Sequence, residues 1–341
     1  MIETTDFQSL FPTRTAHSVL YTAPTLNLYQ RLIQYFSAVT EYGGIYLDLI
    51  NFSRDLFPEV LSMQQIESLL TPEHGYACPD GSVETGRLIR AYESARATRF
   101  LRHSDLTARV HVDFEHTAVG IGGGTTGVIN CLIPSIRDYY LSYRGTKTPV
   151  VVLTVPLYSV YDGIVREHGL RPRYLYTRPE SNFLPTPEEV EELLDERPMA
   201  LILTFPTNPA QSTYGPTRWE ELRPIAYVCQ KTETFLIVDN VYQDTLWEQG
   251  QCNPEIFSLV DTADFISKVF GPSKDRPGCS GFRIGYYCGD PRIREAFFYY
   301  SSIQYNTPNS LSRCYLSLDL LFRLLRLEQR TLSKTDLEAI S

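Results

Sequence analysis

The run FLIVD, at residues 235–239, constrains the fold more than any other stretch, because four apolar residues in succession are followed directly by a carboxylate. A continuous apolar run of this length is typical of a strand buried on both faces, as in a parallel sheet covered by helices. Asp239 then stands at the carboxyl end of that strand, and Tyr242 follows three residues later. Open α/β sheets bind ligands at this edge, although an aspartate here could also be a helix N-cap.

Other stretches predict strands and helices in alternation. PVVVLTV (149–155), RPRYLY (171–176) and MALILTF (199–205) indicate further strands. HTAVGIGGGTTGVINCLIPSI (116–136) indicates a strand, a glycine cluster and a helix, and Thr186 with the carboxylates after it indicates a capped helix start. The 341 residues, 43% of them hydrophobic, are enough for one large α/β domain and a smaller appendage.

Composition excludes several classes of protein. The formal net charge of −9 and the lack of a basic cluster argue against a nucleic-acid partner. The acidic N-terminal segment MIETTDFQSL resembles neither a secretory signal nor a membrane anchor, and no later apolar run approaches the length of a membrane span. The seven cysteines are scattered without a CxxC pair, which predicts reduced thiols in a cytoplasmic protein with no zinc site.

The segment Asp264–Tyr287 contains the candidate chemical centre. Its strand-like beginning ends at Gly271-Pro272, so Lys274 is expected on a turn. A lysine held in a partly desolvated pocket can become a Schiff-base nucleophile. Arg283 lies between two glycines that would let the backbone approach a bound anion. Taken alone, both cations could instead be solvated surface residues, and Lys268, inside the strand-like run, is the rival lysine.

The glycine cluster at 122–127 contains a literal GxGxxG, so a dinucleotide site has to be considered. That fingerprint needs an acidic residue at the end of the second strand, and PVVVLTVP ends without one. Backbone N–H groups at the start of the following helix could bind a single phosphate. The glycines could also serve only tight packing between strand and helix.

The string Ser-Lys, a glycine-rich spacer and Gly-Phe-Arg-Ile-Gly-Tyr resembles the active-site signature of class I/II aminotransferases, which are pyridoxal-phosphate (PLP) enzymes of fold type I. The resemblance implies that Lys274, after Ser273, carries PLP as an internal aldimine and that Arg283 grips its phosphate. It also implies that Gly124 and Thr125 donate to the phosphate.

Other elements extend the resemblance in the same order over residues 76–310. They imply that Tyr158 stacks on the pyridine ring and that Asn208 and Tyr242 hydrogen-bond the phenolic oxygen. Asp239 would keep the pyridine nitrogen protonated, and Tyr76 would reach the phosphate bound by a neighbouring subunit. Taken singly, the tyrosines could be packing residues and the Asn-Pro pair a simple turn.

The sequence departs from the family pattern at several positions. Ala210-Gln211 replace the usual Thr-Gly, Gly271 stands where many members have a phosphate-binding serine, and the interval between Lys274 and Arg283 is one residue longer than usual. No residue matches the arginine that holds the substrate carboxylate in the family's C-terminal domain. Arg14 or Arg54 could replace it.

The resemblance implies a mostly parallel seven-stranded sheet flanked by helices, in a homodimer. The expected organisation is an N-terminal arm and helix (1–45), a large PLP-binding domain (46–310) and a linking helix (311–341) towards a small C-terminal domain that is mostly absent. The expected activity is transamination of an amino acid through Lys274. The alternatives are a PLP-dependent elimination, replacement or cyclisation enzyme of a biosynthetic pathway, a non-catalytic PLP-binding module, and a nicotinamide oxidoreductase.

Overall fold

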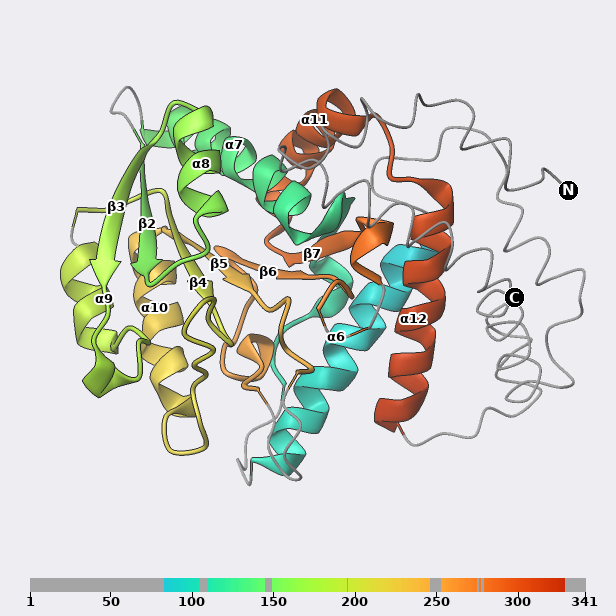
Figure 1. Cartoon of the computed structure of the whole chain (residues 1–341), viewed down its shortest axis with the longest axis horizontal. Helices are drawn as coiled ribbons and strands as arrows, with labels where there is room; N and C mark the ends of the chain where they lie inside the picture. The colour runs from blue at the N-terminus through green and yellow to red at the C-terminus, as the bar shows by residue number, and fades with distance from the viewer. Residues whose placement is uncertain are drawn as a thin grey trace, which may run out of the picture. The chain divides into compact units, whose positions relative to one another are not determined.

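A mixed sheet in the order β1-β7-β6-β5-β4-β2-β3 runs through the described part of the chain (Figure 1). The computed structural model describes residues 83–104, 110–144, 149–194, 196–245, 253–274, 276 and 279–328. The strands are β1 (Ala118–Gly122), β2 (Val150–Val155), β3 (Arg171–Tyr176), β4 (Ala200–Thr204), β5 (Phe235–Asp239), β6 (Ile266–Phe270) and β7 (Gly285–Gly289). β7 is antiparallel to β1 and β6, and the other pairs are parallel. The predicted mostly parallel seven-stranded sheet is confirmed.

Helices cover both faces of this sheet (Figure 1). α7 (Gly124–Arg144), α8 (Val160–Glu167) and α11 (Arg294–Tyr305) contribute to one core cluster, and the other cluster contains α6 (Val83–His103), α9 (Pro187–Leu194), α10 (Leu222–Thr232) and α12 (Ser310–Glu328). Successive residues of β5 alternate between the two clusters, as Phe235 and Ile237 face one and Leu236 and Val238 the other. The apolar run FLIVD is therefore continuous because both faces of its strand are buried.

Local sequence signals account for the start of α9. The Thr186 hydroxyl accepts from the Glu189 backbone N–H at 3.3 Å, and the Glu189 carboxylate accepts from the Thr186 N–H at 3.0 Å. This reciprocal pair is a capping box, which satisfies two backbone donors at a helix start. The expected capping role of Thr186 is confirmed.

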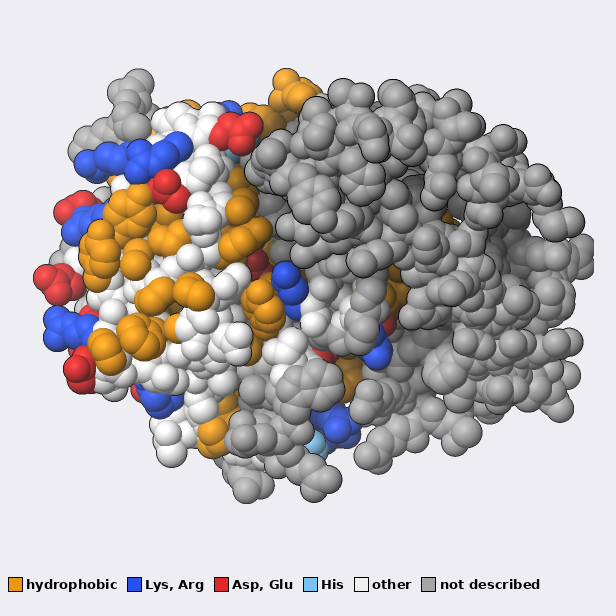
Figure 2. Space-filling model, viewed as in Figure 1, with side chains coloured by type: hydrophobic (Ala, Val, Ile, Leu, Met, Phe, Trp, Pro, Cys, Tyr) orange, Lys and Arg blue, Asp and Glu red, His pale blue; other side chains and the backbone are white. Residues whose placement is uncertain are grey.

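The surface of the described region is mixed in character. On the face seen in Figure 2, basic and acidic side chains are interspersed with apolar ones. Among the described residues, no helix combines the length and apolarity that a membrane crossing requires. The expected N-terminal arm and helix, together with Arg14, Arg54 and Tyr76, lie outside the described residues.

Candidate active site

Most of the predicted cofactor-binding residues gather at one edge of the sheet. Parallel strands end at the same edge, and β7, which runs in the opposite direction, begins there. The residues at this edge are Gly124 and Thr125 after β1, Tyr158 after β2, Asn208 after β4, Asp239 and Tyr242 at and after the end of β5, Ser273 and Lys274 after β6, and Arg283 before β7.

Asp239 is a buried carboxylate with a fixed orientation. Its side chain is enclosed, with the residue 2% exposed, and Oδ2 accepts from the Tyr161 hydroxyl at 2.7 Å while Oδ1 accepts from the Val241 N–H at 3.0 Å. Burial raises the pKa of Asp239 to about 6, against the lowering effect of these two hydrogen bonds. The aspartate does accept a backbone N–H two residues ahead, but residues 241–244 form a turn, so the helix N-cap alternative is wrong.

Tyr161 is a site residue that the sequence reasoning missed. Its hydroxyl lies between Asp239 and the Thr204 hydroxyl, 3.1 Å away, and burial raises its pKa well above the ordinary value. Tyr161 follows three residues after Tyr158, but this spacing does not say which hydroxyl reaches a carboxylate. The Tyr158 ring packs edge-to-face on Tyr161 at 5.5 Å and remains 38% exposed, which does not fit the alternative of a core tyrosine.

Tyr242 lies near both Asn208 and Lys274. Asn208 Nδ2 donates to the Tyr242 hydroxyl at 3.4 Å, and Lys274 Nζ lies 5.9 Å from the centroid of the Tyr242 ring. Burial and then the charge of Asp239 raise the pKa of Tyr242. Lys274 stands on a turn, as predicted, but it is exposed, whereas the sequence argument expected a partly desolvated amine. It lies four residues beyond the end of β6.

Arg283 and the start of α7 form a candidate anion site. Arg283 Nη2 donates to the Gly123 carbonyl at 3.4 Å, and its side chain is exposed and therefore accessible to a ligand. Gly124 opens α7 with a φ of +76°, and a Cβ there would lie 2.8 Å from Arg283 Nη2. A glycine at this point thus lets the guanidinium approach the first turn of the helix, where unpaired N–H groups favour a phosphate.

Gly271 explains one departure from the family signature. A Cβ at this position would lie 2.7 Å from the Ile284 carbonyl oxygen and 3.1 Å from the Gly285 Cα. Both are backbone atoms, so a serine could be accommodated only if β7 shifted. The missing serine is therefore linked to close packing between the end of β6 and the start of β7.

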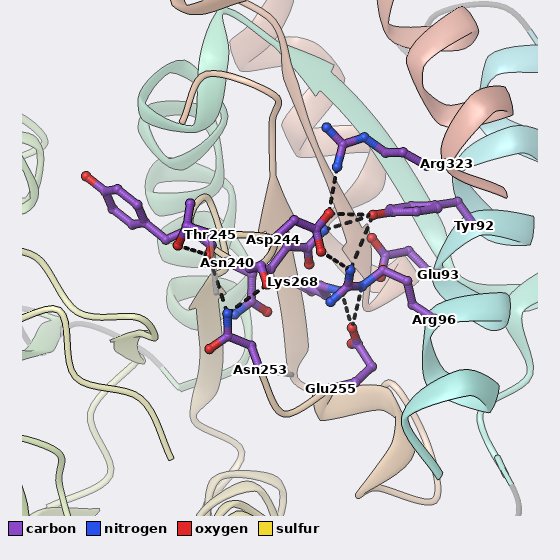
Figure 3. A network of polar contacts seen from close by, with 12 residues as sticks. Tyr92, Glu93, Arg96, Asn240, Asp244, Thr245, Asn253, Glu255, Lys268 and Arg323 are labelled. Carbon is purple, nitrogen blue, oxygen red and sulfur yellow. Dashed lines mark hydrogen bonds and ion pairs between the residues drawn. The ribbon is translucent and has the colours of Figure 1, made fainter. Parts of the chain in front are cut away.

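The rival lysine, Lys268, is enclosed in β6 and already paired. Its Nζ lies 2.5 Å from Glu93 Oε2 and 2.6 Å from Glu255 Oε2, and its side chain is 0% exposed. Figure 3 shows this group continuing through Arg96 to Asp244. An amine held by two buried carboxylates cannot reach a ligand at the carboxyl edge, which leaves Lys274 as the candidate.

The comparisons with known proteins match this geometry. Residues 90–313, more than half of the chain, match the family model "Aminotransferase class I and II". A probable aspartate/prephenate aminotransferase of Thermus aquaticus is 27% identical over 252 residues, which are 71% of this chain and 60% of that protein. An aspartate/prephenate aminotransferase of Thermus thermophilus is 28% identical, with 71% and 59% covered. The chain thus spans about 60% of the length of these relatives.

Solved structures support the fold. An aspartate aminotransferase from Rhizobium meliloti superposes with a TM-score of 0.59 at 21% identity, covering 78% of this chain and 60% of that one. An aromatic aminotransferase from Pyrococcus horikoshii superposes with a TM-score of 0.57 at 19% identity, covering 77% and 64%. The fold is that of fold-type-I enzymes.

These relatives and solved structures are all named as aminotransferases, so they give no support to the elimination, cyclisation or oxidoreductase alternatives. The matching family uses pyridoxal phosphate as its cofactor. The order of the strands, the residues gathered at their carboxyl edge and the family match over residues 90–313 lead to the same result. The chain belongs to the class I and II aminotransferase family.

Proposed function

We propose that this protein is a PLP-dependent aminotransferase that acts on an amino acid and holds its cofactor through Lys274. The observation that supports this most directly is that the buried Asp239, Tyr242 and Lys274 lie at one edge of the sheet, with Lys274 Nζ 5.9 Å from the centroid of the Tyr242 ring. Arg283, set against the first turn of α7 at the same edge, supplies the cation for a phosphate.

The residues present fit PLP in their chemistry. A buried carboxylate suits a protonated ring nitrogen, two hydrogen-bonding groups suit a phenolic oxygen, and a helix start with an arginine suits a phosphate. When bound, PLP supplies an electron sink for the charge that develops at the substrate α-carbon. The residues proposed to hold it are Lys274 at the aldehyde, Asp239 at the ring nitrogen, Asn208 and Tyr242 at the phenolic oxygen, Tyr158 at the ring face, and Gly124, Thr125, Ser273 and Arg283 at the phosphate.

Lys274 and Asp239 have distinct roles in this proposal. Lys274 Nζ would take the proton from the substrate α-carbon and later return a proton. Asp239 acts in its ionised form, held in orientation by Tyr161 and the Val241 N–H. Because the pKa of Asp239 is about 6 in the protein without ligand, we expect cofactor binding to weaken as the pH falls through this value.

The test is the substitution Lys274→Ala, with Lys231→Ala on the exposed surface of α10 as the matched control. We expect Lys274→Ala to lower keto-acid formation by at least about 100-fold, the lower range of what a positioned general base contributes. Without PLP, its unfolding midpoint should stay at the value of the wild type without PLP. Borohydride reduction followed by mass spectrometry should find PLP on Lys274 in the wild type. Undiminished keto-acid formation by Lys274→Ala would show that the assignment is wrong.

The finer features of the proposal concern the whole protein. The names of the Thermus relatives make aspartate the first amino donor to test, with keto-acid formation separating transamination from elimination or cyclisation.

We also propose a homodimer in the cytoplasm, in which Tyr76 reaches the phosphate site of the partner subunit. The proposed organisation remains an arm (1–45), a large domain (46–310) and a linking helix (311–341). Sedimentation of the full chain tests the dimer.

A further inference from the structure

The segment between Lys274 and Arg283 has a proposed cofactor-binding residue at each end. The Lys274 amine and the Arg283 guanidinium have to reach one small molecule at the same time. The relative position of the two residues therefore determines whether the cofactor can bind. Three of the segment's described residues, Arg276, Cys279 and Phe282, contact α12. α12 runs to Glu328, beyond residue 313, where the family match ends.

The first contact is an ion pair with Asp319. Arg276 Nε lies 3.0 Å from Asp319 Oδ1, and the Asp319 side chain is 6% exposed. The other carboxylate oxygen lies 2.6 Å from Arg323 Nε, and Arg323 Nη1 in turn lies 2.6 Å from Asp244 Oδ2 (Figure 3). Asp244 follows two residues after Tyr242. Asp319 therefore links the segment that carries Lys274 to the turn that carries Tyr242.

The second contact involves Tyr315. Its ring stacks on Phe282 with centroids 4.3 Å apart and an interplanar angle of 5°, and its hydroxyl lies 2.8 Å from Cys279 Sγ. Phe282 directly precedes Arg283, so this stack fixes the backbone from which the arginine projects. Tyr315, Asp319 and Arg323 recur every four residues and therefore share one face of α12.

We propose that this face of α12, which we call the α12 anchor (Tyr315, Asp319 and Arg323), positions Lys274 and Arg283 for the cofactor. The proposal rests on the proposed function. The anchor residues are positioning residues, because they act through Arg276 and Phe282. The Asp319 carboxylate is almost buried and pairs with both Arg276 and Arg323. Such charged hydrogen bonds have a defined geometry, so they fix Arg276 relative to α12.

Two substitutions release the segment at separate points. Arg276→Gln removes the ion pair from the segment side and leaves the Asp319–Arg323–Asp244 contacts in place. Tyr315→Leu removes the stack and the hydroxyl. The matched controls are Arg173→Gln on β3, where a half-exposed arginine is paired with Glu196, and Tyr227→Leu on α10, where the tyrosine is 62% exposed.

The first measurement is hydrogen exchange of peptides covering residues 271–283, in the full chain without added PLP. We expect exchange to become about 10-fold faster in both variants and in neither control, with the unfolding midpoint of Arg276→Gln equal to that of Arg173→Gln. The second measurement is the dissociation constant for PLP, which should rise about 10-fold in both variants, as expected when residues that support a ligand shell are lost.

The outcomes separate this proposal from the function on which it rests. Unchanged exchange in Arg276→Gln and Tyr315→Leu overturns the anchor, and so does faster exchange with unchanged PLP affinity. A wild type that takes up no PLP on Lys274 overturns the proposed function instead, while the exchange measurement still reports whether α12 holds the segment. Should Tyr315→Leu fail to fold, Tyr315→Phe, which keeps the stack and loses only the hydroxyl, should give a smaller change in the same direction.

Discussion

At the scale of the residue, Asp239 combines burial with charge, and the two oppose each other. Burial raises its pKa from 3.8 to about 6, so the folded chain binds this proton more tightly than the unfolded chain does. The free energy of unfolding therefore falls as the pH rises from about 4 to 6, and the loss remains above pH 6. At 1.36 kcal/mol per pKa unit, the ionised carboxylate costs the protein without ligand about 3 kcal/mol at most.

We therefore predict that Asp239→Asn stabilises the protein without ligand and lowers its activity. An asparagine can still accept from the Val241 N–H and donate to the Tyr161 hydroxyl, whose own proton can turn to the Thr204 hydroxyl 3.1 Å away, so both neighbours keep a partner. Urea unfolding at pH 8 should show a gain of roughly 1–3 kcal/mol that shrinks as the pH is lowered to 5. Activity should fall by about 100-fold or more, because the charge facing the site is lost.

Asp162→Asn is the control, because its expected change in stability has the opposite sign to that of Asp239→Asn. Hydrogen bonds from Tyr174 and then Arg166 lower the pKa of Asp162, so ionisation of this carboxylate stabilises the folded chain above its unfolded pKa. Its removal should decrease stability at pH 8, with activity unchanged. A loss of stability at pH 8 in Asp239→Asn as well would mean that the buried carboxylate is stabilised by its surroundings.

At the scale of the element, the junction between β6 and β7 has little room. A Cβ on Gly271 would meet two backbone atoms, the carbonyl oxygen of Ile284 just before β7 and the Cα of Gly285, the first residue of β7. We predict that Gly271→Ser, which restores the serine of the family signature, lowers the free energy of unfolding by about 1–3 kcal/mol, as overpacking does elsewhere. Thermal unfolding of the full chain measures this change.

Gly163→Ser is the matched control for this substitution. Gly163 is exposed in α8, and a Cβ added there would meet no heavy atom within 4 Å. Serine is a better helix former than glycine, so stability should rise by up to about 0.5 kcal/mol. Equal stability of Gly271→Ser and wild type, with tighter PLP binding, would contradict the packing explanation and support a lost phosphate contact instead.

The same elements show how far the sequence could lead. FLIVD predicted β5 and the position of Asp239, because a strand buried on both faces has to be apolar throughout. The contact of Tyr161 with Asp239 could not be predicted, since sequence spacing does not say which hydroxyl reaches a carboxylate. Nor could the contacts of α12 with Arg276 and Phe282, because they depend on how a helix face packs against a distant segment.

At the scale of the whole molecule, the candidate site depends on the integrity of the sheet. Its residues follow β1, β2, β4, β5 and β6 and precede β7, so a partly unfolded sheet would separate them. A ligand that binds only the folded chain raises the free energy of unfolding by RT ln(1 + [L]/Kd), about 2.7 kcal/mol at a concentration of 100 Kd. Reaction of PLP with lysines of the unfolded chain would reduce this gain.

We predict that PLP at this concentration raises the unfolding midpoint by about 4 °C, and that pyridoxal, which lacks the phosphate, at the same concentration raises it less. In Arg283→Gln the difference between the two compounds should become smaller, because the cation beside Gly124 is lost while the first turn of α7 remains. The control is Arg223→Gln, which removes an exposed arginine of α10 that pairs with Glu220. This variant should keep the wild-type difference between the two compounds. A preference for PLP that is undiminished in Arg283→Gln would exclude Arg283 as a phosphate ligand and leave the first turn of α7 to bind the anion without it.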